Sequence, residues 1–200
     1  EVNLRDKNLD LKKAKTVLEG TIKDIDSLTL LTNSLILQSK YQNFKNGKKD
    51  PINLKGLAQN VISKLEPNAK EKDIKINLDA DDIKTKGDEN SIRELLTILL
   101  DNAIKFSKKE GKIEISIKDK NNYAQISVKD NGAGIDEKDI PYIFDRFYKA
   151  DTSRSKNEVP GFGLGLSIAK EIVEMHGGKI SVKSKKNVGT KFLVKLPLIQ

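Results

Sequence analysis

A carboxylate and two closely spaced glycines, at the end of an alternating run, most limit how this chain can fold. In Tyr123–Lys129 the apolar residues Ala124, Ile126 and Val128 recur at every second position, which predicts a strand. The run leads into Asp130-Asn131-Gly132-Ala133-Gly134-Ile135. Glycine lets the backbone approach a ligand closely, and a carboxylate accepts a hydrogen bond from an amino group such as that of adenine. The same pattern also describes ordinary turns, so on its own it is compatible with a ligand-binding loop or with an ordinary turn.

Three further stretches accompany this one in a fixed order. They are 88–106 (DENSIRELLTILLDNAIKF), Phe144-Asp145-Arg146-Phe147-Tyr148, and Gly161-Phe162-Gly163-Leu164-Gly165-Leu166. In order and spacing the four stretches resemble the N, G1, F and G2 boxes of sensor histidine kinases. Those ATP-binding domains of two-component systems share a fold with DNA gyrase and mismatch-repair ATPases. The resemblance covers residues 50–198, with a weaker one before, and four ordered boxes are more specific than any single one.

The resemblance implies a fold, cofactors and a set of site residues. The fold is α/β, a two-layer sandwich of the Bergerat type with a mixed sheet and three main helices, preceded by an α-helical hairpin segment. The cofactors are ATP and Mg2+. The implied ATP-binding residues are Asn102, Lys105, Phe106, Asp130, Gly132, Gly134, Ile135, Tyr148, Lys149, Gly161, Gly163, Leu164, Gly165, Leu166 and Thr190.

In the helix predicted at 89–106, Leu99, Asn102 and Phe106 share one face. An asparagine among apolar neighbours needs a hydrogen-bond partner. Asn102 is therefore satisfied by backbone, or it supplies an oxygen to magnesium, a hard cation that prefers oxygen ligands. Lys105 reaches a phosphate as a point charge or is simply solvated. Phe106 packs in the core or, by the resemblance, lies near the adenine.

The glycines at 161, 163 and 165 precede a helix predicted at 166–175. A helix start offers free N–H groups and a positive dipole end to a phosphate; the alternative is close packing of the helix on a sheet. The spacing matches neither the dinucleotide fingerprint nor a Walker loop. By the resemblance, Lys149 neutralises the terminal phosphate and Thr190 helps Asp130 to hold adenine, although Thr190 can also be an ordinary strand residue.

The segment 136–160 is long and polar and ends in Pro160-Gly161. A loop of this length inside a compact domain is usually functional, so we predict a lid over the nucleotide. We expect Phe144, Phe147 and Tyr148 to anchor the lid, and Arg146 and Arg154 to be solvated.

Composition narrows the function further. The chain of 200 residues has no cysteine and one histidine, which excludes disulfides and argues against a zinc site. It has no secretory signal and no apolar run long enough for a bilayer. We therefore expect a cytoplasmic domain of a longer, membrane-anchored bacterial sensor. The net charge of +8 comes from dispersed lysines without a nucleic-acid motif; they form a solvated surface or attract nucleotide or an acidic partner.

Residues 11–37 predict a long amphipathic helix. Its apolar stripe is Leu11, Ala14, Leu18, Ile22, Ile25, Leu28, Leu31 and Leu35. Each buried leucine or isoleucine is worth about 1.5–3 kcal/mol, so the stripe needs a partner helix. By the resemblance this is a hairpin that dimerises into a four-helix bundle, and the alternative is an intramolecular helix. We predict two domains: 1–46, a partial dimerisation hairpin without the phosphoacceptor histidine, and 50–200, the ATP-binding catalytic domain.

The remaining elements follow from periodicity and turn residues. We predict strands at 52–54, 73–79, 84–87, 112–118, 123–129, 179–184 and 191–196, with turns at 120–122 and 187–189, and a helix at 55–72 that Pro67 ends or kinks.

The resemblance implies phosphoryl donation from ATP to a histidine and then to a response-regulator aspartate. Ile98 stands where gyrase-like ATPases carry a water-activating glutamate, which argues against a self-contained ATPase. His176 precedes Gly177-Gly178 and is expected to end a helix; the family's phosphoacceptor lies upstream of Glu1. The alternatives are an anti-sigma-factor-type serine kinase and a degenerate domain that binds partners without nucleotide. The retained Asn102, Asp130 and glycines disfavour the degenerate domain.

Overall fold

The computed structural model describes residues 50–150 and 163–198, and positions 14, 15, 17, 18, 20–22, 25 and 32 nearer the N-terminus. The chain forms two compact units, Glu1–Gly47 and Lys48–Gln200. In the first unit the described positions are helical, and the apolar Leu18, Ile22 and Ile25 are at least half exposed. The rest of the helix predicted at 11–37 lies outside the described residues.

The second unit is built on a five-stranded mixed sheet. Its strand order is β2 (Lys75–Ala80), β4 (Lys112–Lys120), β5 (Tyr123–Asp130), β7 (Gly189–Pro197) and β6 (Lys179–Lys185). β2 pairs parallel to β4, and the other neighbours are antiparallel. A separate antiparallel pair joins β1 (Asp50–Asn53) and β3 (Lys84–Gly87).

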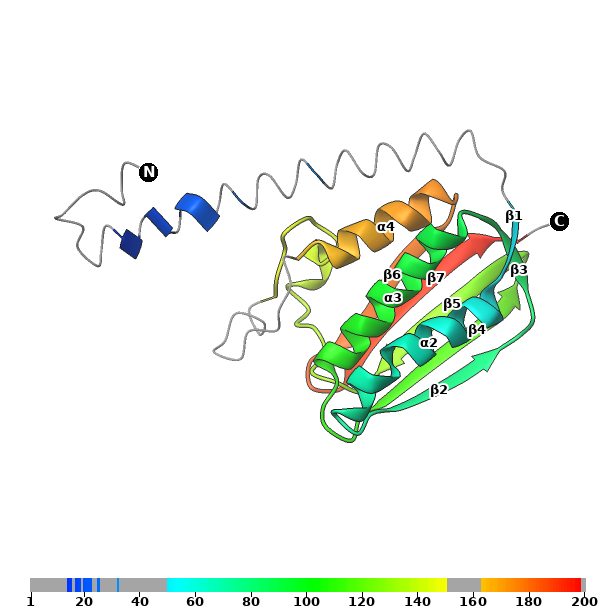
Figure 1. Cartoon of the computed structure of the whole chain (residues 1–200), viewed down its shortest axis with the longest axis horizontal. Coiled ribbons are helices and arrows are strands. Elements are labelled where there is room, and N and C mark those ends of the chain that lie inside the picture. Colours follow the sequence, from blue (N-terminus) through cyan, green and yellow to red (C-terminus); the bar gives the residue numbers. More distant parts are fainter. Residues whose placement is uncertain are drawn as a thin grey trace. The chain divides into compact units, whose positions relative to one another are not determined.

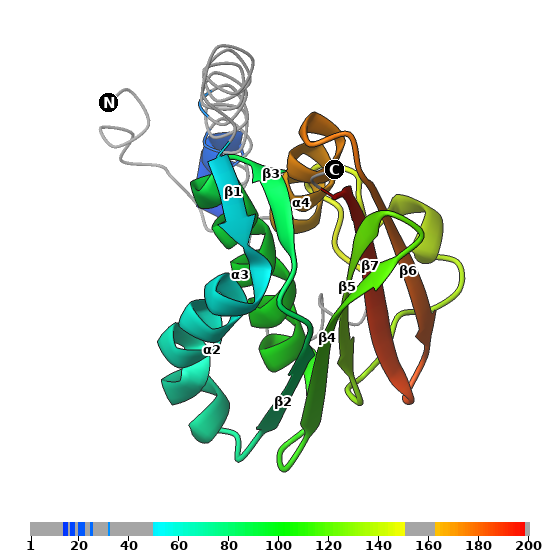
Figure 2. The ribbon, with the colours of Figure 1, turned by 90° about the vertical axis from the view of Figure 1, so that its right-hand side faces the viewer.

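Three α-helices cover one face of this sheet (Figure 1). They are α2 (Leu54–Lys70), α3 (Glu89–Phe106) and α4 (Gly165–Met175), and a short 3-10 helix η2 spans Ile140–Tyr142. α3 contacts both α2 and α4. Figure 2 shows α2, α3 and α4 on one side of the strands, and the short helical turn η2 beside β6. The predicted two-layer α/β sandwich with three main helices is confirmed.

The core lies between the two layers. Alternate residues of the central strands, such as Ile115 of β4 and Ile126 of β5, are buried against α3, which contributes Leu95 and Leu99. Each such side chain is worth about 1.5–3 kcal/mol when fully buried. This packing fixes the ends of β5 and α3 relative to each other.

Left-handed residues form the two hairpin turns. Asn121 and Asn122 have φ of 54° and 65°, and Asn187 has φ of 62°. Asparagine tolerates this conformation better than most residues. Both turns occur where they were predicted.

Pro67 does not end α2, and the strand after this helix starts later than predicted. α2 continues to Lys70 with Pro67 inside it, and the N–H of Glu71 donates to the Pro67 carbonyl. The proline removes one backbone bond, but the buried Leu65 and Ala69 on either side keep the helix packed. The next strand starts at Lys75 instead of residue 73, because Asp73 has φ of 54° and closes the helix.

Candidate nucleotide-binding site

Asp130 lies at the end of β5 and is only 6% exposed. Its Oδ1 accepts hydrogen bonds from the backbone N–H groups of Gly132, at 2.8 Å, and Thr190, at 3.2 Å. Burial raises the pKa of the Asp130 carboxyl above its ordinary value, and the backbone donors oppose that rise. Because both bonds fall on Oδ1, Oδ2 can still accept a hydrogen bond from a ligand.

The two glycines after Asp130 pack on the protein's own backbone. A Cβ on Gly132 would lie 2.1 Å from the carbonyl oxygen of Phe106, and one on Gly134 would lie 2.1 Å from that of Lys185. Gly134 also has φ of 65°, which favours glycine. The neighbouring N–H of Ala133 donates to the Phe106 carbonyl over 3.0 Å. Gly132 therefore lets the loop after β5 pack against the end of α3, and Gly134 lets it pack against the end of β6.

The last turns of α3 carry the three predicted residues of the N box. Asn102 is half-buried, and none of the described residues hydrogen-bonds its side chain, so we find no support for the backbone-satisfied alternative. Lys105 Nζ lies 2.7 Å from Asp101 Oδ2 on the same helix, and its predicted contact with a phosphate stays a prediction. Phe106 is 40% exposed, so its assignment to the core is wrong and its ring is accessible to a ligand.

Lys72 caps the end of α3 from the turn after α2. Its ammonium group donates to the carbonyls of Ile104, at 3.0 Å, and Lys105, at 2.8 Å. The final carbonyls of a helix lack partners within the helix and favour a cation. Sequence reasoning missed this residue, because nothing in a lysine at the end of one predicted helix indicates that it reaches another.

The start of α4 lies beside α3 and the F box. Leu164, the N-cap residue, supplies no side-chain hydrogen bond, so N–H groups of the first turn remain available to an anion. Gly163 has φ of 73°, and a Cβ there would lie 2.7 Å from the carbonyl carbon of Phe147. A Cβ on Gly165 would meet Ile98 of α3 at 3.4 Å. Gly161 lies outside the described residues.

Phe144 and Tyr148 of the F box pack against the core, as predicted; the anchoring role of Phe147 stays a prediction. The Phe144 ring packs edge-on to Phe192, with ring centroids 6.4 Å apart. The Tyr148 hydroxyl donates to Oδ1 of the buried Asp139 over 2.7 Å, so this hydroxyl is engaged within the protein.

The basic residues in and after the F box differ in their surroundings. Arg146 is exposed, as predicted, and also pairs with Glu171 of α4 over 2.7 Å. Lys149 is exposed. Arg154 and the rest of the predicted lid beyond residue 150 lie outside the described residues.

Thr190 belongs to a hydrogen-bond network with Ser184 of β6. Ser184 Oγ donates to the Gly189 carbonyl, at 3.0 Å, and accepts from the N–H of Ile135, at 2.8 Å. It lies 2.9 Å from Thr190 Oγ1. A hydroxyl has one proton, so Thr190 is the donor in that contact and can only accept from a ligand. Sequence reasoning missed Ser184, although a serine at a core-facing position after Ile180 and Val182 was a usable signal.

His176 takes no part in this arrangement. It is the C-cap residue of α4 and is 8% exposed, with Nδ1 lying 2.7 Å from the Ile172 carbonyl.

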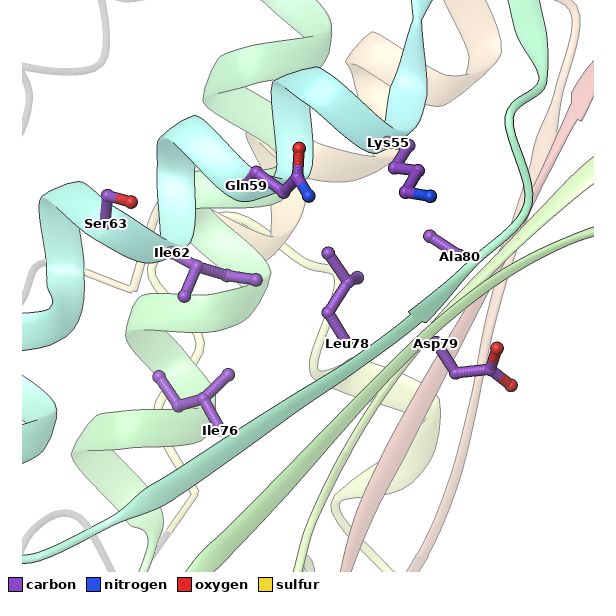
Figure 3. Close-up of a pocket in the computed structure, with 8 residues that line it drawn as sticks. All are labelled: Lys55, Gln59, Ile62, Ser63, Ile76, Leu78, Asp79 and Ala80. Atoms are coloured by element: carbon purple, nitrogen blue, oxygen red, sulfur yellow. The ribbon is translucent and has the colours of Figure 1, made fainter.

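A cavity of about 480 Å³ lies elsewhere, between α2 and β2 (Figure 3). It is lined by Lys55, Gln59, Ile62, Ser63, Ile76, Leu78, Asp79 and Ala80. Ile62, Ile76 and Leu78 point toward one another, whereas Asp79 points to the other side of β2. No residue predicted to bind ATP lines this cavity. The cavity is therefore separate from the candidate nucleotide-binding site.

Residues 87–200 match the family described as histidine kinase-, DNA gyrase B-, and HSP90-like ATPase. The chain belongs to this ATPase family. The resemblance inferred from the four boxes is thereby confirmed, and the chain contains an ATP-binding domain of the kind found in sensor histidine kinases.

Named relatives in this ATPase family are kinases. The sensor histidine kinase YkoH of Bacillus subtilis (strain 168) is 42% identical over 182 residues, which cover 89% of this chain and 39% of that protein. The signal transduction histidine-protein kinase ArlS of Staphylococcus aureus (strain USA300) is 42% identical over 117 residues, which cover 58% of this chain and 26% of that protein. The chain thus spans less than two fifths of the length of either relative.

Solved structures show the same fold. The nucleotide-free catalytic domain of histidine kinase ThkA has a TM-score of 0.66 and 30% identity, over 76% of this chain and 97% of that domain. Full-length ShkA in complex with AMPPNP has a TM-score of 0.71 and 23% identity, over 98% of this chain and 41% of that protein; this second likeness concerns the fold alone. Within the described part of the chain, no helix combines the length and apolar character needed to cross a membrane.

Proposed function

We propose that this chain binds Mg-ATP and donates the γ-phosphate to a histidine of a dimerisation domain, for relay to an aspartate of a response-regulator receiver domain. The observation that carries the proposal is the buried Asp130 carboxylate, held at Oδ1 by Gly132 and Thr190 and adjoining the end of α3. Family membership and the histidine kinases among the relatives support it.

Asp130 is the group that selects adenine. Its Oδ2 accepts a hydrogen bond from the amino group of adenine, whereas guanine presents a carbonyl at that position, which a carboxylate repels. Thr190 offers a further acceptor, since its proton is engaged by Ser184. The exposed Phe106 ring and the half-buried Ile135 provide apolar surface for the base. Gly132 and Gly134 hold the loop in place.

The phosphates lie at the start of α4. The N–H groups around Gly163, Leu164, Gly165 and Leu166, with Gly161 before them, bind the phosphate oxygens. Lys105 and Lys149 are the cations that neutralise their charge, and Lys105 then shares its ammonium group with Asp101.

Asn102 is the proposed magnesium ligand. In the described residues no cluster of three His, Cys, Asp or Glu side chains could hold a metal. One amide oxygen fits Mg2+ only if phosphates and water supply the remaining ligands, which is the usual arrangement for this ion.

The chain's contribution to transfer is positioning and charge neutralisation. Bound ATP supplies the phosphoryl group that is transferred. Ile98 lies beside Gly165 and has no group that could activate water. Hydrolysis is therefore slow unless an acceptor is presented.

The first unit is proposed to be part of a dimerisation hairpin formed by residues 1–46. Leu18, Ile22 and Ile25 occupy helical positions and are exposed. Such a stripe favours burial against another helix, and a second copy of the chain can provide that helix.

Calorimetric titration with Mg-ATP and Mg-GTP tests the proposal. Asp130→Asn keeps an oxygen for Gly132 and Thr190 but turns an NH2 toward the adenine amino group. We expect ATP affinity to fall roughly tenfold to a hundredfold, the worth of a hydrogen bond to a charged group, while the fold is kept. Asp119→Asn, at an exposed position of β4, is the control. Equal affinity of the unmutated protein for ATP and GTP would contradict the role of Asp130.

A further inference from the structure

The face of the sheet opposite the three α-helices distributes its charges unevenly. On the side of β2, β4 and β5, three lysines of β4 and β5 pair with carboxylates. Glu114 lies 2.6 Å from Lys112 and 3.1 Å from Lys129. Lys118 lies 2.6 Å from Asp79 and 2.9 Å from Asp81. Carboxylates therefore offset the charge of these three lysines, whereas the exposed Lys75 and Lys120 form no ion pair within the described residues.

The half formed by β6 and β7 carries five exposed lysines, Lys179, Lys183, Lys185, Lys191 and Lys195. Lys185 lies opposite Gly189; we call the other four, which face one another in pairs, the lysine quartet. The strand register places Lys179 directly opposite Lys195, and Lys183 opposite Lys191. Like charges directly opposite each other destabilise a sheet. Within the described residues none of the four forms an ion pair with a carboxylate, so nothing in the fold offsets the repulsion.

The quartet forms a compact rectangle of charge. Facing Cβ atoms in neighbouring strands are about 5 Å apart, and the two pairs are separated by four residues, or about 13 Å, along the strands. Ser181 and Leu193 face each other between the pairs. No α-helix lies on this side of the sheet (Figure 2), and all four lysines are exposed.

We propose that the lysine quartet docks this domain onto an anionic lipid bilayer. A lysine ammonium group is a mobile point charge on a flexible stem, which suits lipid headgroup phosphates that have no fixed pattern. Arginines and aromatic residues are enriched at protein–protein interfaces, and lysines are depleted there. Single-stranded nucleic acid needs aromatic side chains for stacking. The quartet and the residues between its pairs include neither arginine nor aromatic residues.

Docking leaves the nucleotide site open. Asp130 and Thr190 are buried on the helix-covered face of the sheet, and the quartet lies on the opposite face. A bilayer under the quartet therefore places the helices, and the start of α4, away from the lipid. ATP binding and bilayer binding are independent, which gives each a separate readout.

Co-sedimentation of the 200-residue chain with phosphatidylcholine vesicles, with and without phosphatidylglycerol, tests the proposal. We expect binding only when phosphatidylglycerol is present, and weaker binding as salt rises toward about 0.15 M. Each lysine near an anionic surface should contribute about fivefold. The double variant Lys183→Gln/Lys191→Gln should therefore bind about 25-fold more weakly, and the fourfold Lys→Gln variant of the quartet should not sediment.

The matched control is Lys64→Gln/Lys70→Gln on α2, which changes net charge equally but at exposed positions of the helix layer. We expect a loss of less than about twofold in vesicle binding for this control. The quartet variants should melt at an unchanged or higher temperature, because facing repulsion is removed, and should bind ATP as the unmutated chain does. An equal loss in the α2 control, binding to pure phosphatidylcholine, or quartet-dependent preference for duplex DNA or an acidic protein over vesicles would overturn the proposal.

Discussion

The backbone N–H of Asp88 donates a hydrogen bond to Nε2 of His176 over 3.2 Å. Nδ1 of the same ring lies 2.7 Å from the Ile172 carbonyl, so Nδ1 carries the proton and Nε2 provides the lone pair. The ring is packed against Gly87, where an added Cβ would lie 2.3 Å from Cδ2. This contact ties the end of α4 to the residue that caps the start of α3.

Because His176 is the only histidine and both of its ring nitrogens are engaged, the chain should bind Mg-ATP without labelling itself. We expect no acid-labile phosphate after incubation with labelled ATP, and very slow hydrolysis. A longer chain that includes the helix implied to carry the phosphoacceptor should become labelled. Stable phosphate that disappears in His176→Gln would refute both this prediction and the structural role of His176.

Asn102→Ala should remove the magnesium dependence of ATP affinity, because it deletes the proposed side-chain oxygen ligand. Calorimetry with and without magnesium measures the dependence in both proteins. Asn90→Ala, at an exposed position of the same helix, should leave it unchanged. If the Asn102 variant keeps the full magnesium effect, Asn102 is only a structural residue.

Lys72→Met should destabilise the domain by about 1–3 kcal/mol, because the Ile104 and Lys105 carbonyls lose a charged donor. Urea denaturation measures the free energy of unfolding. The control is Lys70→Met, whose side chain is 73% exposed and pairs with Glu66, and it should cost less than about 0.5 kcal/mol. Similar losses in the two variants would mean that capping of α3 by Lys72 contributes little.

The raised pKa of Asp130 predicts a specific dependence of stability on pH. Between the ordinary carboxyl pKa and the raised one, the folded state holds a proton that the unfolded state has lost. The free energy of unfolding should therefore fall as pH rises through that interval. Asp130→Asn stays neutral and lacks this contribution. Denaturation of both proteins across mildly acidic pH gives the free energy of unfolding of the unmutated protein minus that of Asp130→Asn. This difference should fall as pH rises, and a difference that stays constant or increases would contradict the prediction.

ATP affinity should change with pH in the opposite sense, because the adenine amino group requires the ionised Asp130 carboxylate. Acidification should weaken binding at a pH above the ordinary carboxyl range. The pH profile of Asp130→Asn serves as the reference, because it contains the protonation of the nucleotide but not that of Asp130. Parallel pH profiles for the two proteins would show that Asp130 does not titrate in the site.

Local chemistry made much of the fold predictable. α3 has the bounds 89–106 expected from the sequence, because Asp88 caps its start through the Ser91 N–H and the apolar spacing continues to its end. The hairpin of β4 and β5 follows from strict alternation and two turn asparagines. The parallel pairing of β2 with β4 was not predicted, because a distant strand partner is chosen by packing and not by local sequence.

Site residues could be predicted where the residue type itself indicates the chemistry. Contacts between residues far apart in the sequence could not be predicted. Asp130 and the glycines beside it are conspicuous in the sequence, and the structure brings them to the end of α3. The capping of α3 by Lys72 and the ion pair of Arg146 with Glu171 join segments far apart in the chain. Ser184 was overlooked because a strand serine has many roles, although its core-facing position distinguishes it.

The order of strands in the sheet has a consequence for biosynthesis. β7 follows β6 in the chain but lies between β5 and β6, so a nascent polypeptide that has emerged only as far as β6 cannot pair that strand with the sheet. The same late strand contributes the Thr190 N–H that holds Asp130. Because domains generally fold as units during synthesis, the ribosome must release β7 before the pocket for the base exists. A translation arrest or proteolytic cut just before Gly189 would therefore leave a chain that exposes apolar strand surface to chaperones and holds no nucleotide.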